Sequence, residues 1–150
     1  MSRIVRAQVM FAGLWAGVLL AIGGVAAPAL FSVLDRQQAG AGAGQIFHIE
    51  SRLSLAFAIL LFVLERRRVR DEVEQGVSQS AMSANLLLVL GALFVTVLGG
   101  FALQPMIQAA KAGEPTALSF AALHAVSASL YWVKSLMVLA LAWRMTATAR

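Results

Sequence analysis

Residues 86–103 read LLLVLGALFVTVLGGFAL, and this run decides which kind of fold the chain can adopt. It carries no charge, and its length approaches the roughly 20 apolar residues that an α-helix needs to cross the hydrocarbon core of a bilayer. Thr96 is its one ordinary polar interruption, and Pro105 stands just beyond it. Because proline disrupts a continuing helix, we expect this helix to end there.

Three further apolar runs complete a set of four predicted spans. The stretch Ala7–Leu34 carries no charge and is longer than the apolar region of a secretory signal peptide. The run Leu53–Leu64 is too short alone, so its helix must begin near Gln45. A fourth run extends from about Leu118 to Trp143. We therefore predict an all-α, four-transmembrane-helix bundle in one domain, residues 1–150, with helices at approximately 7–34, 45–66, 85–104 and 118–144.

Composition supports a membrane protein and excludes several chemistries. The chain is 60% hydrophobic and 13% charged, whereas soluble proteins are about half apolar and a quarter charged. The absence of cysteine excludes disulfides, thiolate metal sites and cysteine nucleophiles. Ten arginines against two lysines indicate a GC-rich bacterial genome.

Basic residues are distributed unevenly between the two ends of the predicted bundle. Only Arg36 and Lys111 fall on the side away from the termini. Because cytoplasmic loops collect positive charge, we expect a multi-pass protein of the bacterial cytoplasmic (inner) membrane with both termini inside. The eight basic residues on the inner side are Arg3, Arg6, Arg66, Arg67, Arg68, Arg70, Arg144 and Arg150.

Two segments resemble binding motifs. Glu65–Glu74 reads ERRRVRDEVE, which could bind lipid phosphate or nucleic acid. Its arginines precede carboxylates at i,i+4 spacing, which favours a cytoplasmic extension of the second helix with paired charges. The pairs are Arg67 with Asp71, Arg68 with Glu72, and Arg70 with Glu74. Ala39–Gly44 alternates alanine and glycine, and because no strand precedes it we expect a flexible turn rather than a phosphate loop.

Small residues recur every fourth position in the first span, at Gly13, Gly17 and Ala21. This spacing lets helices approach closely in lipid, either within the bundle or between two copies. The expected partners are the lipid bilayer and either a homo-oligomer or a larger membrane complex, and no nucleic acid.

Ionisable groups inside spans are costly, so each is a candidate for a functional site. In the fourth predicted helix, polar residues at i, i+3, i+7 and i+10 should share a face that points into the bundle. They are His124, Ser127, Tyr131 and Lys134. Lys134 is expected near the midplane, where it could hydrogen-bond to Thr96 or pair with Glu50. The predicted intramembrane polar cluster, which should join the second, third and fourth helices, is Lys134, Glu50, Arg52, Tyr131, Ser127 and Thr96.

His48 and His124 lie at matching heights on two predicted helices. Two facing histidines in a bundle could bind haem b axially or help to bind a metal. No third ligand, CxxCH or HExxH accompanies them. We therefore predict no cofactor, and haem or metal binding by these histidines is the alternative.

Short segments at corresponding places resemble a known family. They are Gly24–Phe31, Ala39–Gly40, Gly44–Phe47 and Phe120–Ser127, together with Pro105. The chain is similar to the transmembrane-protein-205-like domain-of-unknown-function family of small four-helix membrane proteins. The matching residues are Pro28, Phe31, Gly44, Phe47, His124 and Ser127. The resemblance implies a four-helix architecture and no reaction; the animal relative's association with platinum resistance does not carry over to a chain without cysteine.

Two functional hypotheses result. The first is a non-enzymatic membrane protein without catalytic residues, either an accessory subunit or a small-solute-handling bundle centred on Lys134, Glu50 and Arg52. The second is a membrane redox protein that uses the two histidines. No convincing repeat relates the two halves of the sequence, which argues against transport by this chain alone.

Overall fold

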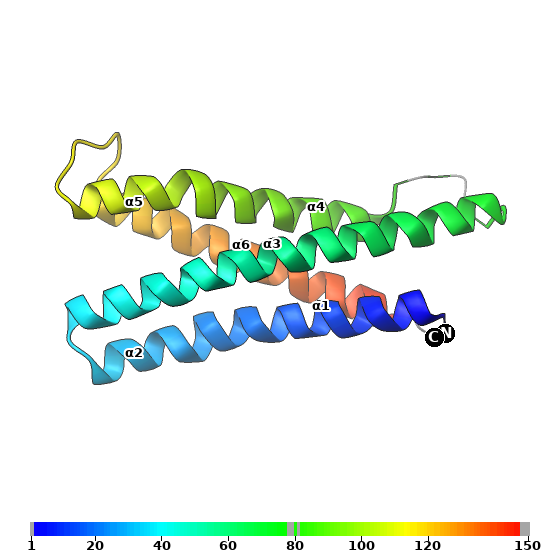
Figure 1. Cartoon of the computed structure of the whole chain (residues 1–150), viewed down its shortest axis with the longest axis horizontal. Helices are drawn as coiled ribbons and strands as arrows, with labels where there is room; N and C mark the ends of the chain where they lie inside the picture. Colours follow the sequence, from blue (N-terminus) through cyan, green and yellow to red (C-terminus); the bar gives the residue numbers. More distant parts are fainter. Residues whose placement is uncertain (1, 78–79, 81, 148–150) are drawn as a thin grey trace.

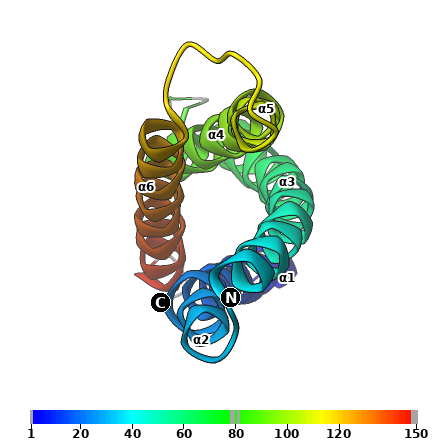
Figure 2. The ribbon, with the colours of Figure 1, turned by 90° about the vertical axis from the view of Figure 1, so that its left-hand side faces the viewer.

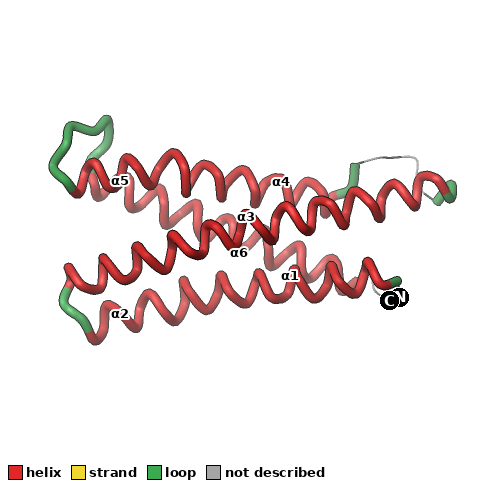
Figure 3. The backbone as a smooth tube through the Cα atoms, in the orientation of Figure 1, coloured by secondary structure: helices red, strands yellow, loops and turns green. Residues whose placement is uncertain are grey.

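A computed structural model describes residues 2–77, 80 and 82–147 (Figure 1). These residues form helices and connecting loops, and the described part of the chain contains no strand (Figure 3). Its two ends lie at the same end of the bundle (Figure 1). The predicted all-helical fold is therefore confirmed.

The chain forms two helical hairpins of the same construction. In the first, α1 (Arg3–Ala21), the π-helical segment η1 (Ile22–Ala26) and α2 (Ala27–Val33) run on as one helix, and α3 (Arg36–Glu74) returns antiparallel to it. In the second, α4 (Ala84–Val97), the π-helical segment η2 (Leu98–Leu103) and α5 (Gln104–Lys111) form the outgoing helix, and α6 (Phe120–Ala147) returns.

The helices form a ring when viewed along the bundle (Figure 2). Helix α1 packs against α3 and α6, and α4 also packs against α3 and α6. Helices α3 and α6 do not pack against each other, so they occupy diagonally opposite corners. Any contact between them must be made by long side chains that cross the centre.

The interior is apolar at its centre, and the outer faces are apolar as well. Trp15, Leu61 and Leu141 are completely buried, whereas Phe94 and Leu136 on the outside are 66% and 65% exposed. A water-soluble bundle would carry polar residues on its outer face. Four continuous helices are long and apolar enough to cross a membrane, which identifies a multi-pass membrane protein.

The predicted turn at Ala39–Gly44 is wrong, because this segment is helical. The connection before it consists only of Leu34 and Asp35, and the Asp35 carboxylate accepts hydrogen bonds from the Gln37 and Gln38 amides. Such a cap satisfies the free amides of the first helical turn. Ala39 and Ala43 are buried, so the small residues pack closely and do not loosen the chain. The second helix thus begins at Arg36 and not near residue 45.

The prediction that Pro105 ends the third helix is also wrong. The helix continues through α5 to Lys111, with Pro105 in the first turn of α5 directly after η2. Pro28 has the same place after η1. Proline cannot donate a backbone hydrogen bond and crowds the preceding turn. A wider π-helical turn before it accommodates this defect without a break in the helix.

The two hairpins are related by an internal correspondence that the sequence analysis did not find. Segment η2 begins at Leu98, 76 residues after Ile22 begins η1, and a pair of glycines follows in each case. The same offset relates His48 on α3 to His124 on α6. Few residues are identical at this spacing. The relation becomes apparent only from the order of elements, which is the same in both hairpins: an outgoing helix, a π-helical segment and a returning helix.

Candidate functional site

A buried ion pair joins α3 and α6, which meet across the interior through side chains alone, the other such contact being that of the Phe47 ring with the Tyr131 ring. The Lys134 Nζ of α6 donates to the Glu50 Oε1 of α3 over 2.6 Å. The two side chains are 5% and 2% exposed. The pair therefore crosses the diagonal of the bundle and lies out of contact with the surroundings.

Two further side chains extend this pair into a network. Ser54, one turn after Glu50, donates to the Glu50 carboxylate and lies 3.5 Å from the Lys134 ammonium. The indole Nε1 of Trp15 on α1 donates to the Ser54 hydroxyl over 2.8 Å. No buried side-chain nitrogen or oxygen among the described residues lacks a partner. We call Trp15, Glu50, Ser54 and Lys134 the diagonal network; it is fully satisfied, as a buried polar group must be to avoid a large desolvation penalty.

Tyr131 connects the diagonal network to the π-helical segment of the first hairpin. Its hydroxyl donates to the Leu19 carbonyl over 2.7 Å and interacts with the Gly23 backbone amide. Insertion of a side chain between a carbonyl and the amide one turn later is a known cause of local helix distortion. The Lys134 ammonium lies 5.3 Å from the centre of the Tyr131 ring, within the range of a cation–π contact.

Gly23 is required at this point because the tyrosine ring occupies the space of a side chain. A Cβ atom added to Gly23 would lie 2.5 Å from the ring carbon Cε1 of Tyr131, whereas one added to Gly24 would meet nothing within 4 Å. The close contact of the Tyr131 ring with η1 therefore depends on one glycine of the pair.

The structure separates the predicted polar cluster into members that meet and members that do not. Glu50 and Lys134 form the predicted ion pair, and Tyr131 lies beside it. Thr96 is buried, but its hydroxyl donates to the Ala92 carbonyl of its own helix and not to Lys134. The network joins the first, second and fourth spans, and the prediction that it joins the second, third and fourth is wrong.

Three other predicted residues lie outside the network. Arg52 is exposed, because it lies on the opposite side of α3 from Glu50. His124 is also exposed and stacks on Phe120, and Ser127 is half-buried. The expected inward stripe on α6 therefore holds for Lys134 and for Tyr131, whose hydroxyl reaches the Leu19 carbonyl of α1, and is wrong for the exposed His124.

The two histidines do not form an enclosed site. His48 and His124 are both exposed, on diagonally opposite helices. No group of three or more His, Cys, Asp or Glu side chains that could hold a metal ion occurs within residues 2–77, 80 and 82–147. Their arrangement gives no support to haem held inside the bundle.

A second polar network closes the end at which the described chain begins and ends. Glu65 is completely buried and accepts hydrogen bonds from Gln8 on α1, Arg68 on α3 and Ser83 before α4, each over 2.6 Å. Ser83 also caps α4. This network was not predicted from the sequence, because the i,i+4 spacing pairs the arginines with the carboxylates that follow them, whereas Glu65 precedes Arg68.

Of the three charge pairs predicted in this segment, the structure shows two. Arg68 pairs with Glu72, and Arg70 lies 3.9 Å from Glu74 with both side chains 69% exposed. No ion pair between Arg67 and Asp71 occurs in the described chain. The helix does extend as predicted, through to Glu74.

Residues 10–116 match a family described as a domain of unknown function (DUF4149). The chain belongs to this family. The DUF4149 match includes Trp15, Glu50 and Ser54, whereas Tyr131 and Lys134 follow it in the chain. A search of curated proteins finds no match, and a search of solved structures finds none either.

Proposed function

We propose that this protein is a non-enzymatic membrane protein that handles a small anionic solute, with the Glu50–Lys134 pair as its charged centre. The observation that carries the proposal is the position of the pair, which lies across the diagonal of the bundle between helices whose backbones do not pack against each other. Ionisable groups inside membrane proteins usually mark solute or proton pathways. A purely structural pair could be made at lower cost between adjacent helices.

The chemistry of the pair indicates how a solute would be accepted. An anion that takes the place of the Glu50 carboxylate beside Lys134 leaves a second negative charge in a low-dielectric interior. Binding a proton at Glu50 removes this charge and restores neutrality. An entering anion is therefore expected to bring one proton with it.

Repeated hairpins with π-helical segments support the same proposal. Many transporters consist of repeats around a site between them, and π-helical turns occur often at functional positions. The Tyr131 hydroxyl donates a hydrogen bond to the Leu19 carbonyl beside η1, and the Tyr131 ring contacts Lys134. Movement of Lys134 would therefore be transmitted through Tyr131 to the π-helical segment.

The test is solute-driven proton flux into liposomes that contain the purified protein and a luminal pH dye. Inward gradients of chloride, nitrate or phosphate are applied in turn, and at least one is expected to acidify the lumen. The variant Glu50→Leu/Lys134→Met should abolish this flux. The matched control is Lys111→Met/Glu114→Leu, which makes the same replacements at exposed positions.

Two outcomes contradict the proposal. If no anion drives flux above that of protein-free liposomes, the bundle does not handle such solutes, and an accessory role in a larger membrane complex is then favoured. If the double variant retains full flux, the pair is not the charged centre.

We further propose that the protein lies in a bacterial inner membrane with both termini in the cytoplasm. Seven of the eight basic residues that support this orientation are described, and Arg150 lies outside the described residues. Because the chain has no cysteine, single cysteines can be placed at Glu74 and Glu114. A membrane-impermeant maleimide should label Glu114→Cys in whole cells and Glu74→Cys only after lysis. The reverse pattern would invert the topology.

We also propose, on the segments Gly24–Phe31 and Phe120–Ser127, that the DUF4149 chain is related to the transmembrane-protein-205-like proteins. Alignment of profiles of the two families should superimpose Pro28, Phe31 and Phe47, which lie inside the DUF4149 match, on equivalent positions. Failure to align them would remove the relation.

A further inference from the structure

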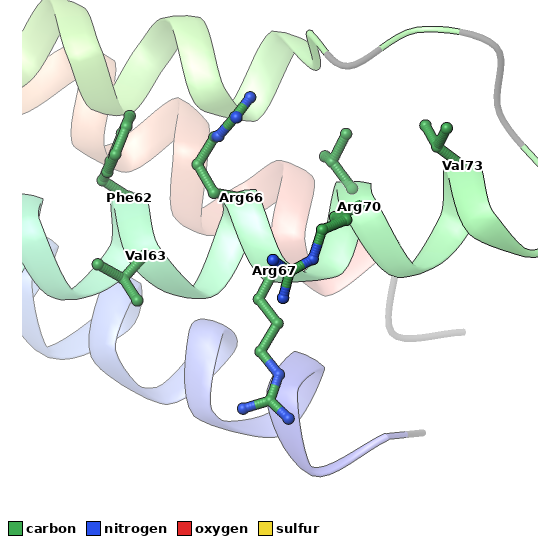
Figure 4. A pocket seen from close by; sticks show the side chains of 7 residues that line it. Phe62, Val63, Arg66, Arg67, Arg70 and Val73 are labelled. Carbon is green, nitrogen blue, oxygen red and sulfur yellow. The ribbon is translucent and has the colours of Figure 1, made fainter.

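A shallow groove follows the surface of α3 where the helix extends beyond the apolar core. Its walls combine apolar and cationic side chains; in Figure 4 the side chains of Arg67 and Arg70 lie together at one edge, and the Arg66 side chain points to the opposite edge. We call it the arginine groove and define it by Phe62, Val63, Arg66, Arg67, Arg70 and Val73.

The cations of the arginine groove are not neutralised by the protein. Arg66 and Arg67 form no ion pair within the described part of the chain, and Arg70 has only a long, exposed contact with Glu74. The neighbouring Arg68 differs, because it turns inward to Glu65. Three guanidinium groups therefore remain available for an outside anion.

The groove lies where the apolar part of α3 gives way to its charged part, as expected at the boundary between hydrocarbon and headgroups. Its apolar members Phe62 and Val63 precede Glu65, at which the buried polar network begins. Arg66 and Arg67 follow at once, and Arg70 lies one turn further. At about 1.5 Å per residue, Val63 and Arg70 are roughly 10 Å apart, close to the depth of roughly 5 to 8 Å of a headgroup layer.

We propose that the arginine groove binds an anionic phospholipid. The phosphate is held by Arg67 and Arg70, which lie together in Figure 4, Arg66 attracts the anionic headgroup from the opposite edge of the groove, and an acyl chain lies along Phe62 and Val63. Arginine matches phosphate because its planar group donates two parallel hydrogen bonds. An acidic peptide or nucleic acid would use the cations but would gain nothing from the apolar wall that continues toward the hydrocarbon core.

The experiment is native mass spectrometry of the delipidated protein, titrated with phosphatidylglycerol or phosphatidylcholine of identical acyl chains. Phosphatidylglycerol should bind more tightly. Each arginine near the membrane surface contributes about a fivefold change, so Arg66→Gln/Arg67→Gln/Arg70→Gln should weaken binding by about a hundredfold. The single variants Arg66→Gln and Arg67→Gln should each weaken it by about fivefold.

The matched control is Arg36→Gln/Arg52→Gln/Lys111→Gln, which removes three exposed cations elsewhere in the protein and should leave binding unchanged. Equal affinity for the two lipids, or equal loss in the control, overturns the proposal. Displacement of the lipid by glycerol 3-phosphate would show that the groove binds free phosphate esters, and displacement by a DNA oligonucleotide at similar concentration would show a nucleic-acid surface; either result overturns the assignment to lipid. The proposal is independent of solute flux through the Glu50–Lys134 pair.

Discussion

Replacement of Lys134 by methionine tests whether the diagonal ion pair holds the bundle together. Methionine retains most of the length of the lysine side chain but removes its charge, so the Glu50 carboxylate stays 2% exposed with one hydrogen bond from Ser54. Removing one partner of a buried pair costs about 3 to 5 kcal/mol, because the other charge is left buried. For a protein of this size that corresponds to a drop in melting temperature of roughly 6 to 20 °C.

The second step replaces both charges. In Glu50→Leu/Lys134→Met no charge remains in the interior, and the Trp15–Ser54 hydrogen bond can persist. Replacement of a buried ion pair by apolar residues of similar volume is often neutral or stabilising by about 1 to 4 kcal/mol. We therefore expect the double variant to melt at or above the temperature of the original protein, although each single variant melts well below it.

Thermal unfolding in one detergent, followed by tryptophan fluorescence, measures all four proteins of the cycle. The difference between the double variant and the sum of the single variants gives the coupling energy of the pair. A Lys134→Met variant as stable as the original protein would refute the reasoning, because a carboxylate as deeply buried as Glu50 cannot lose its partner without cost. Additive effects of the two changes would refute it as well.

Three further changes test other parts of the bundle by the same measurement. Gly23→Ala should destabilise by about 1 to 3 kcal/mol because the added methyl group meets the Tyr131 ring, whereas Gly24→Ala should cause no such loss. Glu65→Gln should cost roughly 1.5 to 3 kcal/mol, since the buried carboxylate accepts a hydrogen bond from a charged arginine, and the exposed Glu74→Gln should change little. Asp35→Ala should cost about 1 kcal/mol through loss of the cap on α3, and Asp35→Asn should retain most of that stability. If the first variant of any of these three comparisons is as stable as the second, the contact assigned to that residue does not stabilise the fold.

The number of helices and their membrane character could be predicted because apolar run length is a direct physical requirement of the bilayer. Helix ends could not be predicted equally well. The segment Ala39–Gly44 has a composition typical of turns, yet the Asp35 cap and close packing of small residues make it helical. Proline ends a helix when the turn before it is α-helical, but the turn before Pro105 is π-helical and the helix continues. A π-helical turn cannot be recognised in the sequence, so the continuation could not be predicted.

The candidate site was partly predictable for a similar reason. An unpaired charge inside the membrane is costly, so buried charges of opposite sign are expected to pair, and Glu50 with Lys134 could be predicted on this ground. The outward position of Arg52 follows from its place two positions after Glu50, about half a helical turn away, but which face of α3 is buried depends on the packing of all four helices. Trp15 and Ser54 carried weaker signals: an indole N–H needs a partner when it is buried, and Ser54 lies four residues after Glu50.

The diagonal position of the ion pair has a consequence for how the bundle can move. Helices α3 and α6 meet through side chains that cross the interior, whereas the backbone of each packs closely on α1 and α4. These contacts are Glu50 and Ser54 with Lys134, and the Phe47 ring with the Tyr131 ring. If the pair is broken, the Phe47–Tyr131 ring contact still joins these two helices, and the outgoing helices can adjust at η1 and η2, where the hydrogen-bond ladder is already irregular. An anion that competes for Lys134 would therefore act on the polar contact across the diagonal and leave a single ring contact to hold α3 to α6, which is why a charge placed across the diagonal suits a site that opens.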